Sequence, residues 1–222
     1  MRILSCIVCA LFLSIVGAGH AAGGTVLVVG DSLSAAYGIE KQLGWVALLE
    51  GRLRARGLPF RVANASITGD TTRGGLSRLP AALDRFDPAV VVIALGGNDG
   101  LRGFAPPQTR ANLRDMIRLS REAGAAVLLL GIKLPANYGK AYGDKFHRIF
   151  QDLATAEGVR VVPFFLEGVA ETRELMQADG IHPDVAAQPR ILDNVWSELA
   201  PMLDTRRASA ELQAGNRQPA SP

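Results

Sequence analysis

One serine of the sequence stands where a nucleophile could work. Ser32 follows the apolar residues 26–29 and a Gly30-Asp31 pair, an order typical of a buried strand that ends at the rim of a sheet. A serine hydroxyl attacks a carbonyl only when a base takes its proton and donors stabilise the negative charge that develops. A serine at this point can also do no more than cap the next helix. Ser32 is therefore a nucleophile only if other residues supply a base and such donors.

The candidate base is His182. Of the three histidines, His20 lies near the N-terminus and His147 in a segment of helical periodicity, where a structural role is expected. Asp179 precedes His182 by three residues, so its carboxylate can accept the Nδ1 proton, fix the tautomer and stabilise an imidazolium. The pair could instead form a structural hydrogen bond or belong to a metal site. No third ligand of suitable spacing is evident in the sequence, so we expect no metal.

Gly69 and Asn98 are the candidate oxyanion donors. Gly69 lacks a Cβ, so its N–H can approach a substrate carbonyl closely. Asn98 can donate its side-chain NH2, and Gly96 and Gly97 leave room beside it. Taken singly, each could be an ordinary turn residue. Their joint occurrence with Ser32 and the Asp-His pair favours acyl transfer by a serine enzyme.

The candidate residues follow segments that predict strands. Five short segments rich in Val, Leu and Ile lack polar alternation, which is typical of parallel strands covered on both faces. The stretches between them have helical periodicity. We therefore predict a three-layer α/β/α sandwich with a five-stranded, mainly parallel sheet, whose carboxyl-terminal edge gathers the functional loops. The predicted strands are residues 25–29, 60–65, 90–95, 126–131 and 159–164, and a last helix is predicted at 189–203.

The two ends of the chain differ from this domain in composition. Residues 1–22 combine a basic start, an apolar run too short for a membrane anchor and small residues, which predicts a cleaved secretory signal peptide. Cleavage would remove both cysteines, Cys6 and Cys9, and with them disulfide and thiolate chemistry. We expect one hydrolase domain at 23–204, a poorly ordered tail at 205–222 and a periplasmic or secreted protein.

Length and charge set further bounds. With 222 residues, 48% of them hydrophobic and 20% charged, the chain suits one folded domain with its own core. The formal net charge of +3 falls to +2 without Arg2, and the basic residues are scattered, so we expect no nucleic-acid partner. A nucleotide- or phosphate-binding module is disfavoured because no Walker motif and no G-x-G-x-x-G follows the first predicted strand.

Four sequence blocks resemble those of the SGNH hydrolases, also called GDSL esterases and lipases. They are Gly30-Asp31-Ser32-Leu33, Gly69, the Gly-Gly-Asn-Asp of 96–99 and Asp179-x-x-His182-Pro183, in the family's order. Further matches within residues 25–203 resemble the periplasmic thioesterase I, lysophospholipase and arylesterase branch. One departure is Ala36, where similar sequences often carry glycine, which implies a stiffer turn after Ser32.

The resemblance implies a role for each of these residues and a flavodoxin-like SGNH hydrolase fold. Ser32 would be the nucleophile, His182 the base and Asp179 the residue that orients His182. The backbone N–H groups of Ser32 and Gly69 and the side chain of Asn98 would form the oxyanion hole. No cofactor is implied.

We therefore expect a serine esterase that hydrolyses carboxylic esters or thioesters of small-molecule or lipid acyl substrates. It would act as a monomer or weak oligomer without a stable membrane anchor. The alternatives are a carbohydrate O-deacetylase and a non-catalytic binding module. Loops after neighbouring strands are expected to line the acyl pocket, although ordinary loop packing explains them equally well. Its candidate residues are Ile67, Arg73, Leu101, Arg102, Pro135, Asn137 and Tyr138.

Overall fold

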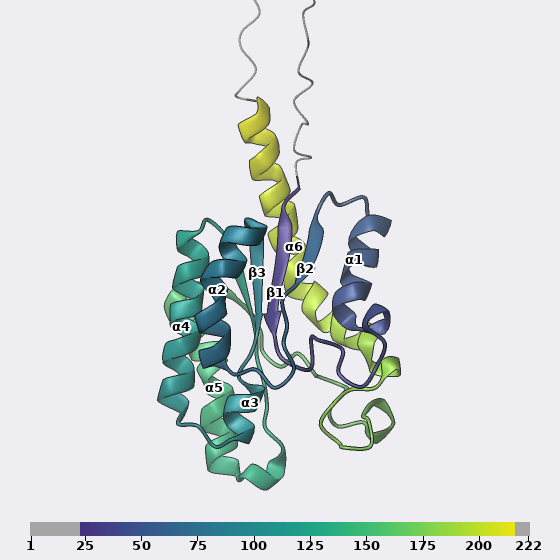
Figure 1. The fold of residues 1–222 in the computed structure, drawn as a ribbon, viewed down its shortest axis with the longest axis vertical. Helices are drawn as coiled ribbons and strands as arrows, with labels where there is room; N and C mark the ends of the chain where they lie inside the picture. The colour runs from purple at the N-terminus through teal and green to yellow at the C-terminus, as the bar shows by residue number, and fades with distance from the viewer. Residues whose placement is uncertain (1–22, 216–222) are drawn as a thin grey trace, which may run out of the picture.

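A parallel sheet lies between two layers of helices in the computed structural model, which describes residues 23–215 (Figure 1). The strand order β2-β1-β3-β4-β5 is that of flavodoxin-like folds, with all neighbours parallel. The strands are β1 (Thr25–Gly30), β2 (Arg61–Asn64), β3 (Pro88–Ala94), β4 (Ala126–Leu130) and β5 (Arg160–Val162). The helices are α1 (Trp45–Ala55), α2 (Thr72–Phe86), α3 (Gly97–Leu101), α4 (Pro106–Glu122), α5 (Lys140–Glu157) and α6 (Gln188–Gly215).

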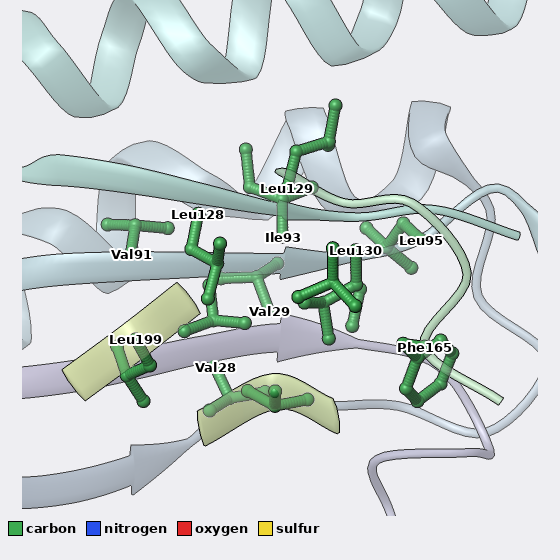
Figure 2. Close-up of a cluster of buried hydrophobic side chains, with 14 of the residues drawn as sticks. Val28, Val29, Val91, Ile93, Leu95, Leu128, Leu129, Leu130, Phe165 and Leu199 are labelled. Carbon is green, nitrogen blue, oxygen red and sulfur yellow. The ribbon is translucent and has the colours of Figure 1, made fainter. Parts of the chain in front are cut away.

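Helices cover both faces of the sheet. In Figure 1, α1 and α6 lie on one side of it and α2, α4 and α5 on the other, in agreement with their packing against the strands. Val28 and Val29 of β1 point to opposite faces, as successive strand residues must, and both are fully buried (Figure 2). The strand segments read as continuous apolar runs because neither face of the sheet meets water.

The predicted fold is confirmed, and each predicted strand is found with its ends shifted by at most two residues. The stretch between the second and third strands forms α2, whose cap Thr71 accepts a hydrogen bond from Gly74 N–H. The short α3, which begins directly beyond β3, was not predicted. None of the helices in residues 23–215 has an apolar stretch that could cross a lipid bilayer. The predicted signal peptide, residues 1–22, and residues 216–222 lie outside the described part.

The prediction of a poorly ordered tail from residue 205 is wrong for residues 205–215, which continue α6. Arg206 fastens this part of the helix to the body, because its guanidinium donates to Ala89 O at 2.9 Å and also to Gly124 O. The segment is rich in Ala, Arg, Glu and Leu, which favour helix. The prediction rested on polar composition alone, which reveals neither the hydrogen bonds of Arg206 nor the helix propensity of the segment.

The turn after Ser32 contains an alanine in a backbone conformation that favours glycine. Ala36 has a φ of 60°, and Asp87 is the one other non-glycine residue with positive φ in the described chain. A left-handed conformation costs an L-residue about 1–2 kcal/mol relative to glycine. The stiffer turn expected from the sequence is therefore also a strained one.

Replacing Ala36 by glycine should relieve this strain. Glycine makes the unfolded chain more flexible, which costs about 0.4–1 kcal/mol, so Ala36→Gly should stabilise the protein by a net amount up to about 1 kcal/mol. Urea unfolding followed by circular dichroism measures the change. Ala35→Gly, one residue earlier and without positive φ, is the control and should destabilise. A clear loss of stability in Ala36→Gly would contradict the strain.

Candidate active site

Ser32 is presented by a tight turn at the carboxyl end of β1. The strand ends at Gly30, and Asp31 O then accepts hydrogen bonds from the N–H groups of Ser34 at 3.2 Å and Ala35 at 2.9 Å. Asp31 Oδ1 also accepts the Leu33 N–H at 3.1 Å. The hydroxyl of Ser32 therefore sits on a fixed backbone at the strand end.

A chain of hydrogen bonds links Ser32 to two residues from the other end of the sequence. Ser32 Oγ lies 2.9 Å from His182 Nε2, and His182 Nδ1 lies 2.6 Å from Asp179 Oδ2. With its Nδ1 proton directed at the carboxylate, the imidazole keeps Nε2 as an acceptor for the serine proton. The three residues thus have the geometry of a nucleophile, a base and an orienting acid.

Asp179 is held as a carboxylate by its own loop. Its Oδ1 accepts the backbone N–H groups of His182 at 3.0 Å and Ile181 at 2.9 Å. The His182 backbone N–H, the His182 ring and the Ile181 N–H together lower the pKa of Asp179 to about 2. Asp179 stays ionised over the neutral range and can stabilise an imidazolium.

Two backbone N–H groups near the serine are free to bind a ligand. Within residues 23–215, neither the Ser32 N–H nor the Gly69 N–H has a hydrogen-bond partner. Gly69 has a φ of 76°, so glycine suits the turn that carries this N–H. Asn98 Nδ2 donates to Asp70 O at 2.9 Å and makes a long contact of 3.4 Å to Asp31 Oδ2. The Asn98 amide is therefore fastened to the turn that contains Gly69.

Buried polar contacts fix the loops after β1, β2 and β3 relative to one another. Asp99, next to Asn98, accepts hydrogen bonds from Thr72 N–H at 2.9 Å and Thr72 Oγ1 at 2.5 Å, which joins α3 to the first turn of α2. Arg78 of α2 pairs with Asp70 at 2.7 Å and also donates to Gly30 O at 3.2 Å. The ends of β1, β2 and β3 are thus tied to one helix.

Asp31 is a buried carboxyl beside the candidate oxyanion site. Burial is the main reason that its pKa rises to about 7, and the charges of Asp70 and Asp99 add to this, while the Leu33 N–H acts in the opposite direction. Its contact with the Leu33 N–H stabilises the turn that presents Ser32. Its side chain also reaches Asn98.

An apolar groove of about 480 Å³ opens beside the serine. Leu33 and Ile181, the neighbours of Ser32 and His182 in sequence, line one part of it, and segments that follow β3, β4 and β5 line the rest. Its lining residues are Leu33, Gly97, Leu101, Ile132, Lys133, Leu134, Pro135, Ala136, Phe164, Leu166, Ala170, Glu171, Met176, Gly180 and Ile181. The groove can accept a hydrocarbon chain attached to a carbonyl at Ser32.

Comparisons with known proteins agree with this geometry. Residues 28–188 match the GDSL-like lipase/acylhydrolase family. The esterase TesA of Pseudomonas aeruginosa is 58% identical over 184 residues, 83% of this chain and 92% of that protein. The thioesterase 1/protease 1/lysophospholipase L1 of Escherichia coli K12 is 44% identical over 194 residues, 87% of this chain and 92% of that protein.

A solved structure shows the same relationship. The psychrotrophic esterase EstA of Pseudoalteromonas sp., in a form inhibited by monoethylphosphonate, aligns with a TM-score of 0.78 and 38% identity. The alignment covers 82% of this chain and 99% of that one. The chain belongs to the GDSL-like lipase/acylhydrolase family. Like other members of this family, it is a hydrolase of carboxylic esters.

The predicted pocket residues of this GDSL hydrolase divide into two groups. Leu101 and Pro135 line the groove. The other five are not among its lining residues. Ile67 is exposed beside the β2 edge, and Arg73 is exposed on α2. Arg102 donates to Gly69 O at 2.9 Å, and Asn137 and Tyr138 continue the 3-10 turn that begins at the lining residue Ala136.

Several groove residues were missed by the sequence analysis. Phe164, Leu166 and Ala170 follow β5, and nothing in their types distinguishes them from ordinary core and loop residues. Only the strand order, which puts β5 at the sheet edge beside β4, brings them to the groove. Among residues 23–215, no cluster of three or more His, Cys, Asp or Glu side chains could hold a metal ion.

The raised pKa of Asp31 predicts that this GDSL hydrolase loses stability as the pH rises. Below about pH 3.8 the Asp31 carboxyl is protonated in both the folded and the unfolded protein, so it does not lower the free energy of unfolding. Between about 3.8 and about 7 only the unfolded state ionises, and the free energy of unfolding should fall by up to about 4 kcal/mol. Asp31→Asn should remove this part of the pH dependence.

Urea unfolding of wild type and Asp31→Asn at pH 4, 5.5, 7 and 8 tests this expectation. The difference in unfolding free energy should shift in favour of the variant as the pH rises through this window. Asp152→Asn, which removes an exposed carboxylate of α5, controls for the loss of one charge. A wild-type-to-variant difference that stays constant from pH 4 to 8 would rule out the shifted ionisation of Asp31.

Proposed function

We propose that this protein hydrolyses acyl esters and thioesters through a covalent acyl-Ser32 intermediate. The observation that carries the proposal is the hydrogen-bonded chain from Ser32 Oγ to His182 Nε2, 2.9 Å, and from His182 Nδ1 to Asp179 Oδ2, 2.6 Å. It links a nucleophile to a base whose tautomer is fixed by an ionised acid.

The reaction follows from this arrangement in two halves. Ser32 Oγ attacks the carbonyl carbon while His182 Nε2 takes the hydroxyl proton, and Asp179 stabilises the imidazolium. The tetrahedral intermediate collapses, the bond to the alcohol or thiol breaks, and the leaving group receives the proton from His182. Water then gives a proton to His182 and attacks the acyl-serine, which releases the acid and regenerates Ser32.

The oxyanion would be held by the N–H groups of Ser32 and Gly69 and by the side chain of Asn98. The free backbone N–H groups support this role, since they have no competing acceptor in residues 23–215. Loss of one such donor typically costs about 10²–10³ in kcat. The phosphonate-inhibited relative supports a serine mechanism, because a phosphonate ester resembles the tetrahedral intermediate.

The apolar groove favours substrates whose acyl group is a chain of several carbons. Aliphatic and aromatic residues predominate in its lining, and it begins at the residue after Ser32. Relatives named as an esterase and as a thioesterase and lysophospholipase support both ester and thioester substrates. A deep apolar groove is not needed for acetyl groups on sugars, so nothing in the site favours a carbohydrate O-deacetylase.

We also propose that residues 1–22 direct export and are removed. The basic start, short apolar run and small residues of this segment support a secretory signal. The mature protein would then act in the periplasm or outside the cell. Intact-mass measurement of protein recovered from the periplasm should give a chain that begins at residue 22 or 23, and a full-length chain there would contradict cleavage.

Substitution of the candidate catalytic residues should abolish turnover while the fold survives. Ser32→Ala and His182→Ala should each lower kcat for p-nitrophenyl esters by at least about 10⁴-fold, because proton transfer to His182 and covalent attack are both lost. His147→Gln, at the other described histidine, is the control and should stay near wild type. A fluorophosphonate probe should label Ser32 in the wild type. Near-wild-type hydrolysis by Ser32→Ala would refute the mechanism.

Filling part of the groove should restrict the acyl chain. Ala170 follows β5, the strand at the edge of the sheet, and lines the groove. Ala170→Trp should lower kcat/KM for decanoyl esters at least about tenfold, since methylenes lose apolar burial of about 0.8 kcal/mol each, and leave acetyl esters unaffected. Ala81→Trp on the surface of α2 is the control. Equal activity of Ala170→Trp on both chain lengths, or wild-type activity confined to acetylated sugars, would refute the groove assignment.

A further inference from the structure

One side-chain amide joins the segment that carries Ser32 to the segment that carries His182. Gln177 Nε2 donates to Tyr37 O at 2.8 Å and to Pro183 O at 3.0 Å. Tyr37 lies in the turn after Ser32, where its N–H donates to Ser32 O at 3.2 Å, and Pro183 follows His182. Gln177 therefore bridges parts of the chain that are 140 residues apart in sequence.

The backbone of Gln177 is fixed relative to His182. Its N–H donates to His182 O at 2.8 Å, and Asp184 N–H donates to Leu175 O at 2.7 Å. An antiparallel bridge between Met176 and Pro183 lies between these two contacts. The histidine loop is thus closed on itself like a short hairpin, and the Gln177 side chain projects from it to the serine turn.

The serine turn is shaped to receive this side chain. Gly38 has a φ of 75°, and a Cβ built on it would lie 2.1 Å from Gln177 Oε1, so only glycine leaves the space. The ring of Tyr37 packs on the imidazole of His182 with centroids 4.5 Å apart. The residue whose carbonyl Gln177 binds is therefore also the residue that supports the imidazole face.

This contact matters because the histidine loop is exposed where it meets the serine turn. Asp179, Gly180 and Ile181 are exposed, and the loop meets the serine turn at its edge. A catalytic base displaced by about 1 Å can cost on the order of 100-fold in rate. A bridge of two hydrogen bonds between the loops restricts such displacement.

We propose that Gln177 is a positioning residue for His182, which sets the distance between Ser32 Oγ and His182 Nε2 by clamping the two loops together. The role rests on the proposed function of Ser32 and His182. It adds a residue outside the four sequence blocks, one that touches neither the substrate nor the reacting atoms.

Two variants of Gln177 test the proposal. Gln177→Glu keeps the size of the side chain but places a carboxylate oxygen against two carbonyl oxygens, and Gln177→Ala removes the bridge. With p-nitrophenyl acetate, both should lower kcat about 10–100-fold while KM stays within about twofold, because alignment for proton transfer is lost and substrate contacts are not. The rate of Ser32 labelling by a fluorophosphonate should fall by a similar factor.

Asn194→Asp is the matched control. Asn194 of α6 also donates its side-chain amide to two backbone carbonyls, Phe165 O at 3.1 Å and Glu167 O at 2.9 Å. The variant therefore loses the same kind of contact, but at carbonyls outside the serine turn and the histidine hairpin. The control should lose stability in urea unfolding and keep kcat within about twofold of wild type.

The possible results separate the positioning role from the proposed function. If Ser32→Ala is inactive but both Gln177 variants keep kcat within about twofold of wild type, the positioning role is overturned and the mechanism stands. An equal loss of kcat in Asn194→Asp would show that the loss is not specific to Gln177, and it would overturn the positioning role in favour of a structural one. If Ser32→Ala stays active, the mechanism itself fails. Should neither Gln177 variant fold, Gly38→Ala displaces the same side chain and should reproduce the loss of kcat; wild-type kcat there would overturn the proposal.

Discussion

The hydrogen bond between Ser32 Oγ and His182 Nε2 is the contact on which the rest of the site depends. Its partners are 150 residues apart in sequence. Bringing them together costs the conformational entropy of closing a long loop, so the fold must hold the bond in place. The parallel sheet meets most of this requirement, because every strand ends at the same edge and delivers its loop there. Arg78 fixes the ends of β1 and β2 from one side of the sheet. On the other side, the last loop lies ahead of α6, and its own short hairpin, Gln177 and the Tyr37–His182 ring contact hold it beside Ser32.

Two aspartates near Ser32 have pKa values shifted in opposite directions. Asp179 must be charged to stabilise the imidazolium, and three hydrogen bonds from its own loop keep its pKa near 2 in an exposed place. Asp31 is buried next to Asn98, where a second negative charge would oppose the oxyanion, and there burial raises the pKa to about 7. Two aspartates near the same serine thus differ in pKa, because Asp179 accepts three hydrogen bonds at the surface, whereas Asp31 is buried with one N–H donor and one long amide contact. The Asn98 contact to Asp31 is long at 3.4 Å, so the Asn98 amide gives up little when it turns that N–H to an oxyanion.

The sequence predicted the sheet, the loops and the residues that the structure brings together, because each depends on short-range patterns. Apolar runs predict buried strands, and Gly69, Asn98, Asp179 and His182 all stand directly after such runs or in the last loop. The groove could not be predicted in the same way, since Phe164 and Ala170 become neighbours of Leu33 only through the strand order. Asn137 and Tyr138 come directly after Pro135 and Ala136, which line the groove, yet they are not among its lining residues. The continued α6 was missed because its anchor, Arg206, binds carbonyls of residues 89 and 124, a contact that no local pattern encodes.

The catalytic residues and most of the acyl groove come from different loops at the carboxyl-terminal edge of the sheet. The nucleophile, the backbone N–H donors and the base come from the loops after β1 and β2 and from the loop before α6, which hydrogen bonds tie to one another. Most of the groove wall comes from residues 132–136 after β4 and 164–171 after β5, and the hydrogen bonds cited above for the triad do not pass through these two segments. Substitutions in those segments can therefore reshape the acyl site with little effect on the Ser32–His182 distance. Leu33, Gly180 and Ile181 adjoin triad residues and also line the groove, and Met176 does so within the histidine hairpin. A change at any of these positions would alter chain preference and alignment together.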